Sequence, residues 1–160
     1  MPARRAVPTV VCMDSTATRT PVETVRAIYR AFGAGDVPGV LDLFDDDITM
    51  EDHGVPTSAQ RAGHSLLRLR RGKDDAAAFF AEAGALTPHE FTVHEVLGSP
   101  AGGTVAALVT VEFSLPHGGR YRDAEVHVWT VGAAGLATSV RHVVDTAKHL
   151  EASQGVDTTR

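Results

Sequence analysis

The sequence has little cysteine, few aromatic residues and no excess of positive charge. Its 160 residues include one cysteine, Cys12, so neither an intramolecular disulfide nor a metal site of several thiolates can form. Lysine and arginine total 15 against 20 acidic residues, a formal charge of -5, and no basic segment is interleaved with aromatic residues. We therefore expect no nucleic-acid partner. The sequence also gives no sign of a membrane span, and the single cysteine fits a reducing cytoplasm.

The composition is otherwise that of an ordinary globular protein, with 43% hydrophobic and 22% charged residues. The length predicts one domain, over residues 20–152, with enough chain to bury a core. Residues 1–19 hold only a short apolar run, which Pro8 interrupts, so we expect a disordered tail and no signal peptide. Met13 is an alternative start. The polar residues 153–160 are expected to fray.

The first half of the sequence predicts three helices. Residues 20–23 (TPVE) form a capping box with proline at the first helical position, and apolar residues then recur at helical spacing. Asp36 caps a second, short helix, and the alanine-rich residues 74–83 predict a third. A short strand is expected over residues 48–52. Residues 54–72 lack a stable period, which is typical of a functional lid or a disordered loop.

The second half predicts an antiparallel sheet. Residues 89–97, 104–115, 121–131 and 136–145 alternate as strands, separated by turn residues. Helices followed by such a meander indicate an α+β fold in which the sheet bends to accept the helices. Alternation places Glu125, His127 and Trp129 on one strand face and valines on the other. We expect one face of the sheet to line a pocket and the outer face to pack against a second subunit.

Several segments together resemble a known family. The runs YRAFGAGD (29–36) and LFDDDITMED (43–52) are similar to the N-terminal half of the NTF2-like superfamily, especially its SnoaL-like and ketosteroid-isomerase-like branches. The runs EVHVWTV (125–131) and RHVVDT (141–146) resemble its last two strands. The resemblance implies a cone-shaped barrel with three N-terminal helices on a strongly curved antiparallel sheet, a deep apolar cavity and usually a homodimer.

The resemblance also implies two catalytic residues. Asp52 lies where ketosteroid isomerases have their catalytic carboxylate, and His127 lies where they have a protonated aspartic acid that donates to the oxyanion. The tyrosine of those enzymes aligns near Ile28, one residue before Tyr29. Burial makes a carboxylate a stronger base, and a facing donor stabilises the enolate that forms when a proton leaves carbon. Asp52 is therefore predicted to take the proton and His127 to polarise or protonate the oxygen, with no cofactor.

Asp145 leaves a different chemistry open. It resembles the last-strand aspartate that limonene-epoxide-hydrolase-like members use as an acid, although their Arg-x-Asp on an earlier strand has no counterpart here. The structural alternative, which the position favours, is that Asp145 pairs with Arg141 or caps a helix that starts near Thr146. SnoaL-type polyketide cyclases need only an acid-base residue in an apolar chamber, which matches what is present. The histidines are scattered without a His-x-x-x-His pattern, so we predict no metal site.

The remaining candidates are side chains expected to bind the substrate. They are Tyr29, Phe32, His53, Phe79, Trp129, Arg141 and Val143. The sequence thus predicts a cytoplasmic SnoaL-like enzyme that uses general acid-base catalysis on a small, largely apolar carbonyl compound, of isomerase or polyketide-cyclase type. The alternatives are a non-catalytic dimer that binds a small molecule and a limonene-epoxide-hydrolase-like enzyme.

Overall fold

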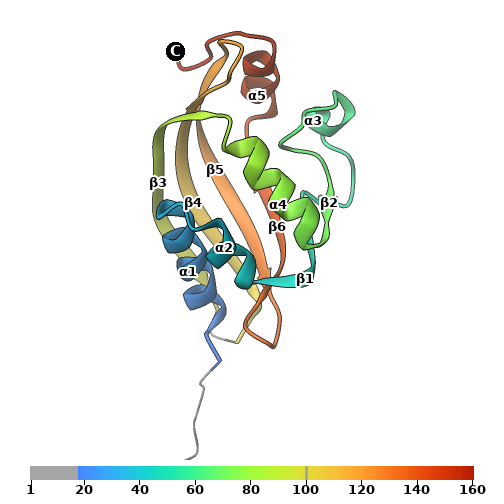
Figure 1. Cartoon of the computed structure of the whole chain (residues 1–160), viewed down its shortest axis with the longest axis vertical. Coiled ribbons are helices and arrows are strands. Elements are labelled where there is room, and N and C mark those ends of the chain that lie inside the picture. The colour runs from blue at the N-terminus through green and yellow to red at the C-terminus, as the bar shows by residue number, and fades with distance from the viewer. Residues whose placement is uncertain (1–17, 100) are drawn as a thin grey trace, which may run out of the picture.

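A sheet with the strand order β2-β1-β6-β5-β4-β3 forms the frame of the protein. The computed structural model describes residues 18–99 and 101–160, so most of the tail expected over residues 1–19, with Cys12 and Met13, lies outside the described residues. The sheet is strongly curved and open, with β2 and β3 as its edges (Figure 1). Its strands are β1 (Phe44–Met50), β2 (Arg70–Arg71), β3 (Thr87–Gly98), β4 (Thr104–Ser114), β5 (Arg120–Val131) and β6 (Ala137–Val143). The predicted α+β arrangement is confirmed.

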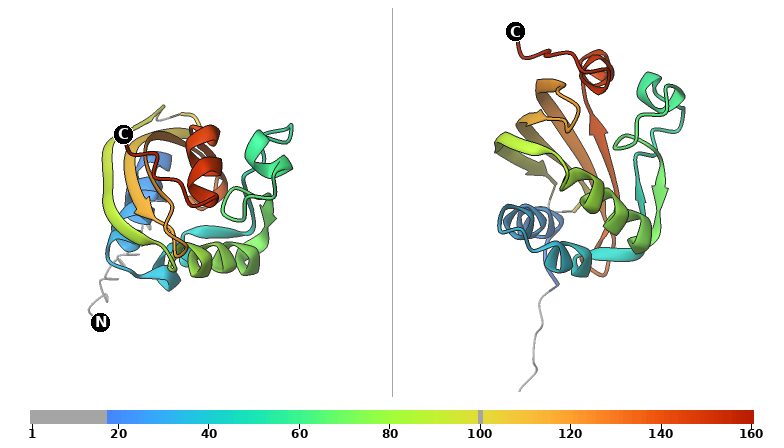
Figure 2. Two further views of the ribbon diagram at one scale, coloured as in Figure 1. Left: turned by 90° about the horizontal axis from the view of Figure 1, so that it is seen from above. Right: turned by 45° about the horizontal axis from the view of Figure 1, so that its top comes forward.

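The helices occupy two places relative to this sheet. In the described part of the chain they are α1 (Pro21–Gly33), α2 (Val37–Asp42), α3 (Ser58–Arg61), α4 (Gly72–Ala83) and α5 (Thr146–Ser153). The first, second and fourth lie against the concave face, whereas α3 and α5 lie near each other at the opposite end of the molecule (Figures 1 and 2). None of the described helices combines the length and apolar character needed to cross a membrane.

Helix α1 begins at the predicted capping box. The backbone N–H of Glu23 donates to the Thr20 hydroxyl at 3.3 Å, and the Glu23 carboxylate accepts from the backbone N–H of Thr20 at 2.8 Å. The helix then buries Val25 and Ile28 in the main apolar cluster. Further buried members of this cluster are Val40, Phe44, Ile48, Met50, Val105, Trp129 and Val140. This cluster fixes α1 and α2 over the sheet.

The buried faces of the central strands follow the expected alternation. Three residues of β4 lie opposite three residues of β5, and all six are buried: Val105 with Trp129, Ala107 with His127, and Val109 with Glu125. The polar side chains of β5 therefore point into the interior, beneath the helices.

One pair of strands differs from the predicted antiparallel sheet. β1 pairs with β6 in parallel, with Thr49 opposite Ser139 and Met50 opposite Val140. β6 pairs on its other side with β5 in the antiparallel sense. The last strand therefore lies inside the sheet, between two strands that are far apart in the sequence.

The expected loop over residues 54–72 is partly regular. It contains α3 and β2, and β2 pairs with β1. Arg70 anchors this segment, because its buried guanidinium donates to Glu82 Oε2 at 2.8 Å and to the Ser65 carbonyl at 2.9 Å. The segment thus packs against α4. β1 also begins earlier than predicted, at Phe44, and α4 begins at Gly72.

The end of the chain lies beside the start of β5. The backbone N–H of Arg120 donates to the Val156 carbonyl at 3.1 Å, and the backbone N–H of Thr158 donates to the Arg120 carbonyl at 2.8 Å. These two bonds hold the C-terminal segment against the start of β5.

Candidate active site

Two small cavities lie between the concave face of the sheet and the helices. One has a volume of about 70 Å³ and the other about 90 Å³. Aromatic and aliphatic side chains form most of both walls, including the predicted Tyr29 and Trp129 in the smaller cavity. Five residues line both cavities: Phe32, Phe79, Phe91, His127 and His142. The two histidines are thus central to any chemistry in this interior.

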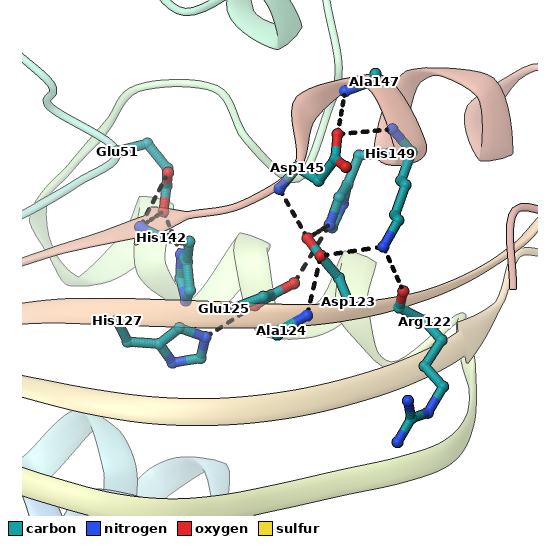
Figure 3. Close-up of polar contacts among 11 residues, drawn as sticks. Glu51, Arg122, Asp123, Ala124, Glu125, His127, His142, Asp145, Ala147 and His149 are labelled. Atoms are coloured by element: carbon teal, nitrogen blue, oxygen red, sulfur yellow. Dashed lines mark hydrogen bonds and ion pairs between the residues drawn. The ribbon is translucent and has the colours of Figure 1, made fainter.

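A buried carboxylate is paired with one of these histidines. The Glu51 side chain is 0% exposed and its Oε1 bonds to Nδ1 of His142. The backbone N–H of His142 also donates to Oε1, at 3.3 Å, and His53 Nε2 lies 3.2 Å from Oε2. The ring of His142 lies between Glu51 and His127 (Figure 3), with its centroid 4.2 Å from that of His127. The pair therefore presents an imidazole to the cavities with a carboxylate behind it.

The backbone at Glu51 turns this side chain inward. Glu51 has φ 61°, the left-handed region that a non-glycine residue adopts at a cost of about 1–3 kcal/mol. Its N–H donates to the Val140 carbonyl at 2.9 Å, and its own carbonyl accepts from Gln60 Nε2 at 2.7 Å. The conformation interrupts strand alternation, so Met50 and Glu51 are both buried. The next residue consequently points outward.

The structure does not bring Asp52 and His127 together. The Asp52 side chain is 47% exposed and pairs with Arg71 on the surface, at 3.5 Å. His53 contacts Glu51, and both line a third, more polar groove of about 390 Å³ together with Asp52 and Arg68. Because φ at Glu51 reverses the expected order, the interior carboxylate is Glu51, one residue before the predicted one.

Both ring nitrogens of His127 are already bonded. Nδ1 lies 2.7 Å from the Tyr29 hydroxyl, which also accepts from Trp129 Nε1 at 3.1 Å, and Nε2 lies 2.9 Å from Glu125 Oε2. Burial and the nearby His142 lower the pKa of His127 to about 4. A neutral ring that donates from Nε2 to Glu125 leaves Nδ1 to accept from Tyr29. His127 therefore orients the Tyr29 hydroxyl, and its own nitrogens are occupied.

The Glu51–His142 pair favours its ionised form. Burial opposes the charge on Glu51, but His142 and His53 outweigh it, so the pKa of Glu51 falls below its ordinary value. Burial likewise acts to lower the pKa of His142, but the Glu51 and Glu125 carboxylates together raise it above its ordinary value. The carboxylate thus makes His142 a stronger base than an isolated buried imidazole.

These shifts predict how stability depends on pH. The contribution of protonated His142 to the free energy of unfolding is fully present below its ordinary pKa of 6.5. It is lost as the pH rises through the raised pKa of the folded protein. The contribution of Glu51 is complete above its ordinary 4.5 and is lost as pH falls through its lowered folded value. Wild type should therefore exceed Glu51→Gln in free energy of unfolding most strongly between pH 4.5 and 6.5, and by less at alkaline pH.

Urea unfolding of both proteins across this range measures the difference. The other groups that face the pair, which are His53, His127, Glu125 and His149, are present in both proteins, so the comparison isolates the pair. A difference that does not change with pH would show that the pair is not ionised.

Three predicted residues of the last strand and its end lie away from the cavities. On β6, Val140 and His142 face inward, so Arg141 and Val143 face outward, and Val143 is 51% exposed. Asp145 is exposed and caps α5, because its carboxylate accepts from the backbone N–H groups of Ala147 at 3.1 Å and Lys148 at 3.4 Å. The alternation that places Val140 inside would have indicated His142.

A second polar cluster lies further along β5. Asp123 and Glu125 of β5 and His149 of α5 are all buried (Figure 3). Asp123, Glu125 and His149 are not among the site residues predicted from the sequence. Only the approach of α5 to β5 brings them together, and no local sequence spacing signals that approach.

Comparison with known proteins identifies the family. The chain belongs to the SnoaL-like domain family, whose profile matches residues 25–140. Among solved structures it is similar to Δ5-3-ketosteroid isomerase from Mycobacterium sp., with 27% identity, 78% of this chain and 93% of that chain covered, and a TM-score of 0.59. It is also similar to RV0760c from Mycobacterium tuberculosis in complex with estradiol-17β-hemisuccinate, with 25% identity, the same coverage and a TM-score of 0.61.

An NTF2-like protein from Burkholderia xenovorans gives the same fold. The identity is 22%, the alignment covers 85% of this chain and 98% of that chain, and the TM-score is 0.67. No curated protein matches the chain. The predicted membership of the SnoaL-like branch of the NTF2-like superfamily is therefore confirmed.

Proposed function

We propose that the protein catalyses proton transfer at the carbon next to the carbonyl group of a small, largely apolar compound. The observation that carries this proposal is the buried Glu51–His142 pair, whose imidazole lines both apolar cavities. A carboxylate that binds one imidazole nitrogen fixes the ring and leaves the other nitrogen to act as a general base. His142 is accordingly the proposed catalytic base, and Glu51 is the residue that positions it.

The Tyr29 hydroxyl is the proposed donor to the substrate oxygen, and its single proton, which His127 Nδ1 accepts in the structure, turns to the substrate oxygen when the substrate binds. Burial raises the pKa of Tyr29, which keeps the phenol protonated. The hydroxyl accepts a hydrogen bond from Trp129, and such a bond strengthens its own donation. Tyr29 and His142 line the smaller cavity together. A carbonyl compound held there can give a proton from carbon to His142 while its oxygen accepts from Tyr29, so the developing enolate is stabilised.

The cavity volumes restrict the substrate. Pockets for drug-sized ligands are roughly 300–1,000 Å³, whereas the cavities here are about 70 and 90 Å³. We therefore propose a substrate much smaller than a steroid. Isomerase and polyketide-cyclase chemistry both begin with the same proton abstraction, and the proposal includes both types. A cytoplasmic location and a homodimer through the outer sheet face stay predictions.

Replacing Glu51 tests the proposal, with its neighbour as the matched control. We expect Glu51→Gln to slow enzyme-dependent deuterium exchange at the carbon next to the carbonyl of small ketones by about 10- to 100-fold, and Asp52→Asn to change the rate by less than about twofold. The rate should rise with pH as His142 loses its proton, and Glu51→Gln should move this inflection to lower pH because the carboxylate that raises the pKa of His142 is gone.

The exchange can be followed by NMR in D₂O with a panel of small ketones that starts with cyclopentanone. A rate for wild type no higher than that of buffer with every ketone would contradict the proposal. Equal loss in Asp52→Asn and Glu51→Gln would contradict the assignment of the carboxylate.

A second candidate function is binding of a small molecule without turnover. It is supported by the mostly apolar cavity walls and by the related mycobacterial structure in complex with estradiol-17β-hemisuccinate. This candidate predicts saturable binding of small apolar ketones with no deuterium exchange in wild type.

A further inference from the structure

The cluster of Asp123, Glu125 and His149 has the donor atoms of a metal site. One oxygen of each carboxylate and one nitrogen of the histidine all lie within 4.8 Å of one another. The side chains are 5%, 7% and 5% exposed in that order, so the cluster is shielded from solvent. Two carboxylates and one imidazole suit zinc and similar divalent transition metals.

The imidazole nitrogen of His149 faces both carboxylates at ion-pair distance but makes no well-aligned hydrogen bond with either. His149 Nε2 lies 3.4 Å from Asp123 Oδ2 and 3.3 Å from Glu125 Oε1, yet it is buried without a hydrogen-bond partner in the described structure. Ligands bonded to a tetrahedral zinc ion at about 2.0–2.1 Å are about 3.3–3.4 Å from one another. The two separations therefore match neighbouring ligands of one ion.

Hydrogen bonds from neighbouring groups orient both carboxylates, as is usual for carboxylate ligands of metal ions. Asp123 accepts from the backbone N–H of Asp145 at 2.8 Å and of Ala124 at 2.9 Å. Glu125 uses Oε2 to accept from His127, which leaves Oε1 directed at His149 (Figure 3). These contacts fix the two oxygens that face His149.

The charge of the cluster favours a dication. With His149 protonated, the three side chains carry a net charge of -1, whereas a divalent ion with neutral His149 brings the net charge to zero. Uncompensated charge is unfavourable in a buried site. Lys148 offers partial compensation, but its Nζ is 3.7 Å from Asp123 Oδ1 and its side chain is 38% exposed, so it lies on the solvent side of that carboxylate.

We propose that Asp123, Glu125 and His149 bind one divalent transition metal ion, with Zn²⁺ as the reference ion. Glu125 and His149 also line the cavity of about 90 Å³, together with Tyr121, His127 and His142. Three protein ligands leave a fourth position, which faces this cavity and accepts a water or a substrate oxygen. Glu125 and His149 share this cavity with His142, but neither Glu51 nor His142 is a ligand, so zinc binding and proton transfer are tested by different variants.

Zinc binding to the full chain, after removal of metal with a chelator, tests this site. Cys12 is replaced by serine in every protein so that its thiol does not compete. Isothermal titration should show one equivalent of Zn²⁺ bound by the parent protein, and His149→Gln and Asp123→Asn should each weaken this binding by about 100-fold or more. His53→Gln, which alters the other buried carboxylate–histidine cluster, and His94→Gln, on the surface, should bind as the parent protein does.

Two measurements keep the test valid if a ligand variant folds poorly. Zn²⁺ should raise the melting temperature of the parent protein. In the ¹⁵N-histidine NMR spectrum of the parent protein, Zn²⁺ should shift the His149 side-chain signals most strongly. The proposal is overturned by absence of stoichiometric binding, by unchanged binding in well-folded His149→Gln and Asp123→Asn, or by loss of binding in His53→Gln or His94→Gln.

Discussion

Replacing His142 by alanine is expected to reduce enzyme-dependent deuterium exchange in small ketones by about 10²–10⁴-fold, the usual contribution of a general base. The effect should exceed that of Glu51→Gln, because alanine removes the base itself and glutamine removes only the group that positions it. Exchange rates from NMR, at a pH where wild-type His142 is neutral, give the comparison. The phenol of Tyr29 stays in place in this variant, so the remaining rate reports what oxygen stabilisation alone achieves.

The matched control is His94→Ala. His94 is exposed on β3 and bonds to the Thr110 hydroxyl at 2.7 Å, away from both cavities. Its replacement should leave the exchange rate unchanged. If His142→Ala retained the wild-type rate while circular dichroism showed a folded protein, another residue would have to be the base.

The largest expected effect on stability comes from Phe44→Ala. Phe44 is 0% exposed in the main apolar cluster, with its ring centroid 6.2 Å from that of Phe80 and 6.0 Å from that of Trp129. Truncation removes buried area and leaves a cavity that these rings cannot fill, so we expect a loss of about 3–5 kcal/mol in free energy of unfolding. Domains of this size have about 5–15 kcal/mol in total, so the variant should unfold at much lower urea concentration.

Val143→Ala provides the comparison for Phe44→Ala, because it also shortens an apolar side chain of the sheet. Val143 is 51% exposed on the outer face, and its truncation should change the free energy of unfolding by less than about 0.5 kcal/mol. Urea denaturation followed by circular dichroism measures both variants. A loss below about 1 kcal/mol for Phe44→Ala would mean that the surrounding rings repack into the vacated volume.

Much of the fold could be predicted from local sequence signals. The capping box of α1, the helical spacing that follows it, and the alternation in β4 and β5 each depend on neighbours within a few residues. Those signals also placed His127 and Trp129 inside. The parallel pairing of β1 with β6 could not be predicted, because it depends on residues about 90 positions apart and no local pattern encodes strand direction.

Local sequence patterns also failed to identify individual residues of the site. The family resemblance selected Asp52, and the alternate burial of Ile48 and Met50 would also place residue 52 inside. The left-handed conformation at Glu51 reverses the order, and the bonds that hold it come from Val140 and Gln60, in distant segments. His149 was missed for a similar reason, since the docking of α5 on β5 places it beside Asp123 and Glu125.

The interior position of β6 has a consequence for synthesis on the ribosome. β1 is synthesised long before its parallel partner β6, so β1 has only the two-residue β2 as a strand neighbour until β6 has left the ribosome. Glu51 and His142 likewise meet only when β6 inserts. We therefore expect nascent chains that end before β6 to depend on chaperones. The Glu51–His142 pair should form late in folding, when β6 joins the sheet.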